Sequence, residues 1–159
     1  MSNLQGKKGV RLEELFPIIE EKLRLGGSVT FRPHGVSMRP LIRQGKDSVT
    51  VGALDKTPQV GDVIFYCRSD GQFVLHRIVG EDKNGYILCG DNQKILEHGV
   101  KPEWIIGILT AVSRKDKVLD CSGKSYNRYV KVVLPIWRIW VRLRGILGAV
   151  KRNIKRRLS

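Results

Sequence analysis

The segment GVSMRP at positions 35–40 places a serine between apolar neighbours, with a glycine before it and a proline after it. A serine on such a stiff turn has the placement that an exposed nucleophile needs. The hydroxyl of serine is a weak nucleophile at neutral pH, so it requires a general base within hydrogen-bond distance. We therefore ask which side chain could take the proton of Ser37.

Three histidines are the candidates for this base. His76 lies in the apolar run FVLHRIV at 73–79, and an imidazole pKa near 6.5 suits a general base close to neutral pH. His34 is close to Ser37 along the chain, but closeness in a turn does not give in-line proton transfer, and His98 is the third candidate. A single histidine in an apolar strand is often only structural, so the assignment of His76 depends on the residues that accompany it.

Four motifs accompany these two residues in order: Ser-Met-x-Pro at 37–40, Gly-Asp-Val-Ile at 61–64, His-Arg-Ile-Val at 76–79 and Gly-Asp-Asn at 90–92. Together they resemble the signal peptidase I clan of serine peptidases, which includes the LexA-type repressors, over roughly residues 30–111. The His-Arg pair resembles the histidine-base signal peptidases of the endoplasmic-reticulum type. The resemblance implies that Ser37 is the acyl-forming nucleophile and His76 its general base.

Two acids are candidates for orienting His76. Asp91 belongs to the Gly-Asp-Asn motif, whereas Glu97 occupies about the place where the endoplasmic-reticulum type has an acid. Either carboxylate could hold the imidazole tautomer and stabilise the imidazolium. Asp91 could instead only shape a turn, and Glu97 could be a solvated loop acid. Both acids therefore stay candidates at this point.

The resemblance also implies an oxyanion hole formed by the backbone N–H of Ser37. Many signal peptidases have a second serine two positions before the nucleophile, but this chain has glycine there, so only main-chain donors are expected. The residues expected to shape the oxyanion and substrate sites are Gly35, Val36, Met38 and Pro40. We expect a polypeptide substrate that binds as an extended strand, with small residues near the scissile bond implied by the resemblance alone. No metal or organic cofactor is expected, and Cys67, Cys89 and Cys121 contain no CxxC pair.

Short β-rich runs surround these motifs at 28–31, 48–51, 63–67, 73–79, 86–89 and 105–112, after a predicted amphipathic helix over 11–25. The pattern predicts a mainly β, α+β fold with a barrel-like body, which the resemblance makes signal-peptidase-like. We divide the chain into a helical segment over 1–27, a catalytic β domain over 28–123 and a basic tail over 124–159.

The tail carries eleven of the 29 Lys and Arg residues and no acid, so most of the chain's net charge of +14 lies in it. Apolar residues recur at helical spacing from Ile136 to Ile154, which predicts a basic amphipathic helix. This helix could pack on the body with its charges solvated, or residues 134–159 could bind an anionic membrane surface. We favour a membrane over nucleic acid as the partner because few aromatic residues interleave the charges.

No stretch of the sequence has the length of a spanning helix or of a secretory signal. We therefore expect a cytoplasmic enzyme, peripheral on the inner face of the membrane. The alternative is a non-catalytic module of the same fold that docks on membrane or nucleic acid through its tail. The presence of both Ser37 and His76 favours the serine endopeptidase, because a non-catalytic protein of the same fold has no chemical need for the pair.

Overall fold

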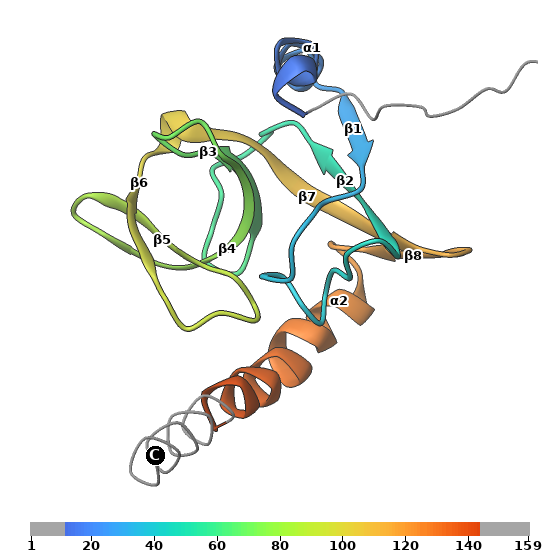
Figure 1. Ribbon diagram of the computed structural model, residues 1–159, viewed down its shortest axis with the longest axis vertical. Coiled ribbons are helices and arrows are strands. Elements are labelled where there is room, and N and C mark those ends of the chain that lie inside the picture. Colours follow the sequence, from blue (N-terminus) through green and yellow to red (C-terminus); the bar gives the residue numbers. More distant parts are fainter. Residues whose placement is uncertain (1–11, 144–159) are drawn as a thin grey trace, which may run out of the picture.

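The computed structural model describes residues 12–143 and is mainly β, with an antiparallel eight-stranded sheet and a few helices (Figure 1). The strand order is β1-β2-β7-β3-β4-β5-β6, and β8 pairs with β7 outside this path. The elements are α1 (Leu12–Arg24), β1 (Ser28–Phe31), β2 (Asp47–Gly52), β3 (Val63–Cys67), β4 (Phe73–Asp82), β5 (Gly85–Cys89), β6 (Glu97–Val100), a 3₁₀ turn (Pro102–Trp104), β7 (Ile105–Arg114), β8 (Lys117–Asp120) and α2 (Lys124–Arg128).

The sheet is open, because its outermost strands β1 and β6 do not pair with each other. The barrel-like body expected from the sequence is therefore not closed. Figure 1 shows that β3, β4, β5 and β6 curve into a rounded half, while β1, β2 and β8 form the other half. Strand β7 belongs to both halves, because its start pairs with β3 and the rest pairs with β2, with Ile108 at the point of change.

Two apolar cores follow from this division. The first lies between α1, β1, β2 and the face of β3 and β4 that is outside the rounded half, and it includes Leu23, Met38, Val51 and Phe65. The second fills the rounded half, with Ile64, Ile78 and Leu88 among its buried residues. Met38, next to Ser37 in the sequence, belongs to the first core, so the candidate nucleophile is attached directly to packed side chains.

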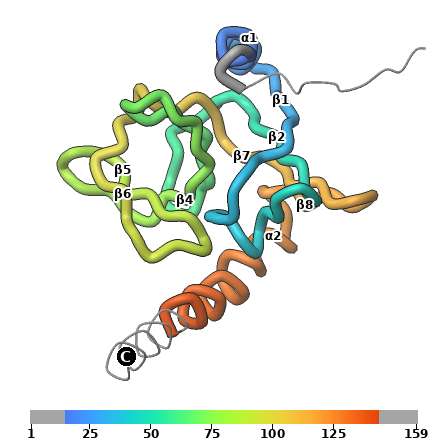
Figure 2. Tube along the Cα trace, viewed as in Figure 1, coloured from blue at the N-terminus to red at the C-terminus, as the bar shows by residue number. Residues whose placement is uncertain are grey.

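The C-terminal helix begins earlier than the sequence pattern suggested. Instead of starting near Leu134, it starts at Lys124 with α2, passes through a π-helical turn at Tyr129–Val133 and continues as α-helix to residue 143 (Figure 2). Proline at 135 has no N–H for the carbonyl four residues earlier, and the π turn directly before it is the kind of irregularity that accompanies such a gap. The predicted helical residues beyond 143 lie outside the described residues.

One face of this helix packs against the body. Tyr126, Leu134 and Val141 are buried, at spacings of two turns. Tyr126, in the first turn of the helix, anchors its start in the interior. Within residues 12–143, no helix is both long and apolar enough to cross a membrane.

Candidate active site

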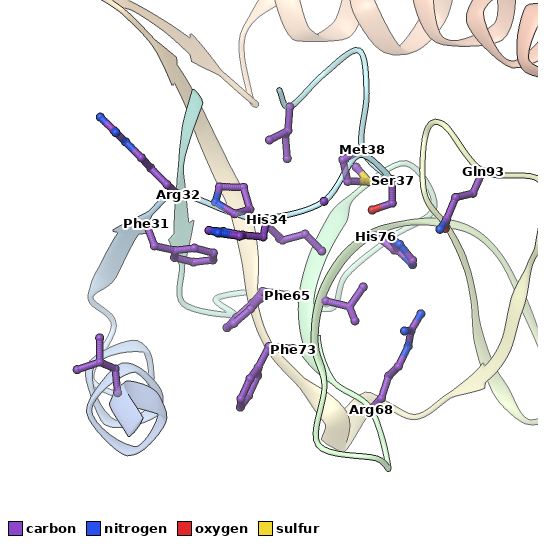
Figure 3. Close-up of a pocket in the computed structure, with 16 residues that line it drawn as sticks. Phe31, Arg32, His34, Ser37, Met38, Phe65, Arg68, Phe73, His76 and Gln93 are labelled. Carbon is purple, nitrogen blue, oxygen red and sulfur yellow. The ribbon is translucent and has the colours of Figure 1, made fainter. Parts of the chain in front are cut away.

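A cleft of about 900 Å³ opens between α1, β1 and β4, and both Ser37 and His76 line it. In the close-up of Figure 3, the Ser37 hydroxyl is directed to the side of the cleft where the His76 ring lies. The two residues come from different parts of the chain, since Ser37 follows β1 and His76 lies in the middle of β4. The fold therefore brings the predicted nucleophile and the predicted base to one cavity.

The loop that carries Ser37 has a defined backbone. Gly35 has a φ of +95°, in the left-handed region where glycine is favoured, and its N–H donates a hydrogen bond to Gln44 Oε1 at 3.2 Å. After the serine, Met38 is buried and its carbonyl accepts the N–H of Ile42 at 2.9 Å. Ser37 is thus held between a turn that favours glycine and a residue anchored in the core.

The Gly-Asp-Asn motif at 90–92 packs directly on this loop. The backbone N–H of Asn92 donates to the Ser37 carbonyl at 2.7 Å, and Asn92 Nδ2 donates to the Val36 carbonyl at 3.2 Å. A Cβ on Gly90 would lie 2.7 Å from the Ser37 carbonyl oxygen, which is closer than real Cβ atoms come. Residue 90 must therefore be glycine for the two segments to touch.

His76 is buried, and its Nδ1 atom lies near two polar side chains, Tyr66 on β3 and Glu97 at the start of β6. Nδ1 lies 3.4 Å from the Tyr66 hydroxyl and 3.8 Å from Glu97 Oε2. The Tyr66 hydroxyl donates a hydrogen bond to Glu97 Oε2 at 2.7 Å, so its oxygen can accept a hydrogen bond from a protonated Nδ1. This arrangement favours the tautomer with hydrogen on Nδ1, which leaves Nε2 as the basic nitrogen.

Glu97 is held in place by Arg68 as well as by Tyr66. Arg68 Nε donates to Glu97 Oε1 at 2.9 Å, and Arg68 Nη2 donates to Oε2 at 2.5 Å. Although burial raises the pKa of Glu97, these hydrogen bonds from Arg68 and Tyr66 hold it below its usual value. Glu97 is therefore ionised at neutral pH and lies next to the imidazole.

The environment of His76 favours its neutral form. Burial and then the positive charge of Arg68 lower the pKa of His76 to about 4, although the negative charges of Glu97 and Asp91 act in the opposite direction. At neutral pH the ring is unprotonated and can accept a proton, as a general base must.

Asp91, the other candidate acid, has a different partner. Its carboxylate accepts two hydrogen bonds from Arg77, from Nε and Nη2, each at 2.8 Å, and a third from the Tyr129 hydroxyl at 2.8 Å. Arg77 also donates to the Tyr126 hydroxyl at 2.8 Å and to the Gly61 carbonyl at 2.6 Å. The aspartate is thus committed to a buried ion pair that joins β4, the Gly-Asp-Asn loop and the C-terminal helix.

The remaining predicted residues divide between the cleft and the surface. Gly35 and Met38 line the cleft, whereas Val36 is half exposed and, like Pro40, is not among the lining residues. Of the other histidines, His34 lines the cleft but is exposed. His98 instead pairs with Asp82 at 3.1 Å on the surface, apart from this site.

Sequence patterns gave no indication of four residues that build this site. Tyr66 and Arg68 hold Glu97, while Tyr126 and Tyr129 hold the Arg77–Asp91 pair. The period of two along β3 could have identified Tyr66 as facing the same side as Ile64. No local signal connects it with Glu97, which is 31 residues away.

In residues 12–143, no group of three or more His, Cys, Asp or Glu side chains could hold a metal ion. Comparisons with protein-family models, with curated proteins and with solved structures gave no significant match. A function for the chain must therefore be argued from the chemistry of the cleft itself.

Proposed function

We propose that this protein is a serine endopeptidase of the signal-peptidase-like type, with Ser37 as nucleophile and His76 as general base. One observation carries the proposal: Ser37 and a neutral, buried histidine line one cleft, with an ionised carboxylate behind the histidine. Nucleophile, base and orienting acid are the three components that a serine hydrolase needs.

Acylation of Ser37 would begin with proton transfer from its hydroxyl to His76 Nε2 as the oxygen attacks the substrate carbonyl carbon. Glu97, through the Tyr66 hydroxyl, would stabilise the imidazolium that forms. The imidazolium would then give its proton to the leaving amine, and the peptide bond breaks. Water activated by the same histidine would hydrolyse the ester and restore Ser37.

The negative oxygen of the tetrahedral intermediate needs donors near the serine. The backbone N–H of Ser37 has no hydrogen-bond partner in the part of the chain that the structure describes. The substrate carbonyl oxygen could therefore accept a hydrogen bond from this N–H as negative charge develops on it, as in an oxyanion hole made of main-chain donors.

An extended substrate has a strand to pair with. β1 is the outermost strand at its end of the sheet, and the chain runs from it directly into the Ser37 loop. A peptide added to the edge of β1 would lie beside the cleft, which is β-augmentation.

The experiment that tests the proposal is cleavage of a proteome-derived peptide library, followed by mass spectrometry of the products. We expect new termini that are produced by the wild-type protein and absent with Ser37→Ala, with Ser69→Ala, an exposed serine on the β3–β4 turn, as control. Cleavage that is equal for wild type and Ser37→Ala, or absent from both, would contradict the proposal.

The acidic limb of activity should lie well below the usual histidine range. Only neutral His76 can act as base, and burial lowers its pKa to about 4, so kcat/KM should rise with pH around 4 and stay flat through pH 6 to 8. Initial rates on one library-derived peptide between pH 3.5 and 8 measure the position of this limb, and an unperturbed histidine would place it at about 6.5. A limb centred near the unperturbed value would contradict the assigned environment of His76.

Glu97→Gln should lower kcat by about 10²- to 10⁴-fold. The change removes the negative charge that raises the pKa of His76 and leaves the Arg68 cation uncompensated beside the imidazolium. Steady-state kinetics measure the loss, with Glu103→Gln, an exposed acid on the 3₁₀ turn, as the matched control. An unchanged kcat would remove Glu97 from the mechanism.

A second proposed property is attachment to an anionic membrane surface through the C-terminal helix. Opposite its buried face, the helix exposes a row of apolar side chains, each between 43% and 64% exposed: Val132, Val133, Ile136, Ile139, Trp140 and Leu143. Basic residues flank this row, and no acid occurs from residue 124 onward. An apolar row with basic flanks suits the interface of an anionic bilayer. On this proposal the enzyme works in the cytoplasm, at the inner face of the membrane.

Replacing Ile136 and Ile139 together with glutamate should abolish sedimentation with vesicles that contain phosphatidylglycerol. The change removes two exposed apolar contacts and adds two charges that anionic lipid repels. The control is Val118→Glu, an equally exposed valine on β8. Equal sedimentation of the double variant would contradict lipid binding by this face, and stronger binding to DNA than to vesicles would favour nucleic acid as the partner.

A further inference from the structure

The cleft beside Ser37 is much larger than small substrate side chains require. Its volume of about 900 Å³ lies at the upper end of the range for ligand pockets. Figure 3 shows Phe31, Phe65 and Phe73 gathered on one side of the cleft, away from Ser37 and His76. The cleft therefore has a reactive end and an aromatic end.

The aromatic end has a continuous floor and wall. Phe65 contacts Phe31 with 5.4 Å between ring centroids and Phe73 with 5.8 Å, and Phe73 contacts Phe16 on α1 at 4.6 Å. Such contacts connect α1, β4, β3 and β1 through packed rings, so this end of the cleft is preformed. Phe31 and Phe73 are only partly buried, and Leu15 on α1, which lines the same cleft, is 38% exposed.

Partly exposed apolar surface in a preformed concave site gains free energy when an apolar group covers it. A small side chain such as alanine would cover little of this surface, because the rings lie on the other side of the cleft from Ser37. An aromatic or large aliphatic side chain could fill the space between Leu15, Phe31 and Phe73.

We infer that the substrate carries a large apolar side chain, aromatic or branched aliphatic, within a few residues of the scissile bond. The aromatic end of the cleft, formed by Leu15, Phe31, Phe65 and Phe73, binds this side chain. The inference rests on the proposed peptidase function. It adds a bulky specificity residue to the small residues that the family resemblance implies near the cut.

The test uses the Ser37-dependent cleavages from the peptide library. We expect Phe, Leu, Met, Trp or Ile to be enriched at one fixed position near the cut. In a synthetic copy of the best peptide, replacing that residue with alanine should lower kcat/KM by about 10- to 200-fold. Because this comparison changes only the peptide and uses the wild-type protein, its result does not depend on how any protein variant folds.

A protein variant tests the location of the pocket. Leu15→Trp narrows the aromatic end and should shift the preference at that position toward smaller residues. The matched control is Ile18→Trp on the same helix, because Ile18 is 67% exposed and does not line the cleft.

The outcomes separate the inference from the function on which it rests. Ser37-dependent cleavage that prefers only small residues near the cut would overturn the inferred pocket for a large side chain. An unchanged residue preference in a folded Leu15→Trp variant would also overturn it. Both results would leave the peptidase proposal standing. If the library gives no Ser37-dependent cleavage, the peptidase proposal fails and the inference fails with it.

Discussion

Replacing Ser37 with alanine should lower kcat for peptide cleavage on the order of 10⁶-fold, and replacing His76 with alanine should have an effect of similar size. The two residues act as a unit, because the base is needed only to activate the serine and to protonate the leaving group. The double variant should therefore be no slower than either single variant. Pre-steady-state and long-time-course assays on one library-derived peptide measure the three rates.

Two exposed residues provide matched controls for these variants. Ser69→Ala and His98→Ala remove the same groups from the surface, outside the cleft. Both should keep wild-type rates. Multiplicative losses in the Ser37/His76 double variant, or substantial activity left in either single variant, would contradict the dyad.

Asp91→Ala should destabilise the protein by about 3–5 kcal/mol. Asp91 and Arg77 are both buried, and the change leaves the Arg77 guanidinium inside the protein without its counter-charge. It also removes the acceptor of the Tyr129 hydroxyl, which joins the C-terminal helix to the site. Urea denaturation followed by circular dichroism measures the free energy of unfolding of both proteins.

A surface ion pair serves as the control for this stability change. Glu21 and Arg24 form a salt bridge at 2.8 Å on α1, with both side chains largely exposed, and exposed pairs contribute little. Glu21→Ala should therefore leave the denaturation midpoint almost unchanged. An equally small effect of Asp91→Ala would show that the buried pair is not what fixes the Gly-Asp-Asn loop.

The sequence predicted the strands whose own residues favour β-structure. The runs at 28–31 and 63–67 have the bounds of β1 and β3, and the other apolar runs correspond to β2, β4, β5 and β7. β6 and β8 were not predicted. β6 consists of Glu-His-Gly-Val, and it is a strand because Tyr86 and Leu88 of β5 pair with it. Pairing rather than local propensity makes such strands.

Residue type and motif singled out Ser37 and His76, and the fold places both of them in one cleft. The residues that contact them were not predicted. The sequence left Asp91 and Glu97 equivalent, whereas in the fold Glu97 lies behind His76 and Asp91 binds Arg77. The difference depends on which strands are neighbours, because Glu97 meets Tyr66 only through the order β3-β4-β5-β6.

The sequence predicted residues 124–159 as a basic tail separate from the catalytic domain, but two of its residues hold the Arg77–Asp91 pair. Tyr126 accepts a hydrogen bond from Arg77, and Tyr129 donates one to Asp91. The apolar periodicity read from the sequence begins at Ile136, after both tyrosines, so the pattern could not reveal this contact.

The most direct test of the central claim is covalent labelling of Ser37 by a fluorophosphonate, which loses fluoride when an activated serine attacks its phosphorus. Intact-mass measurement and peptide mapping of the wild-type protein should find one phosphonyl group, on Ser37. The label should be absent from Ser37→Ala and strongly slowed in His76→Ala, because the histidine removes the proton of the hydroxyl. No label on Ser37 in the wild-type protein, or equal labelling when His76 is absent, would contradict the Ser37–His76 mechanism.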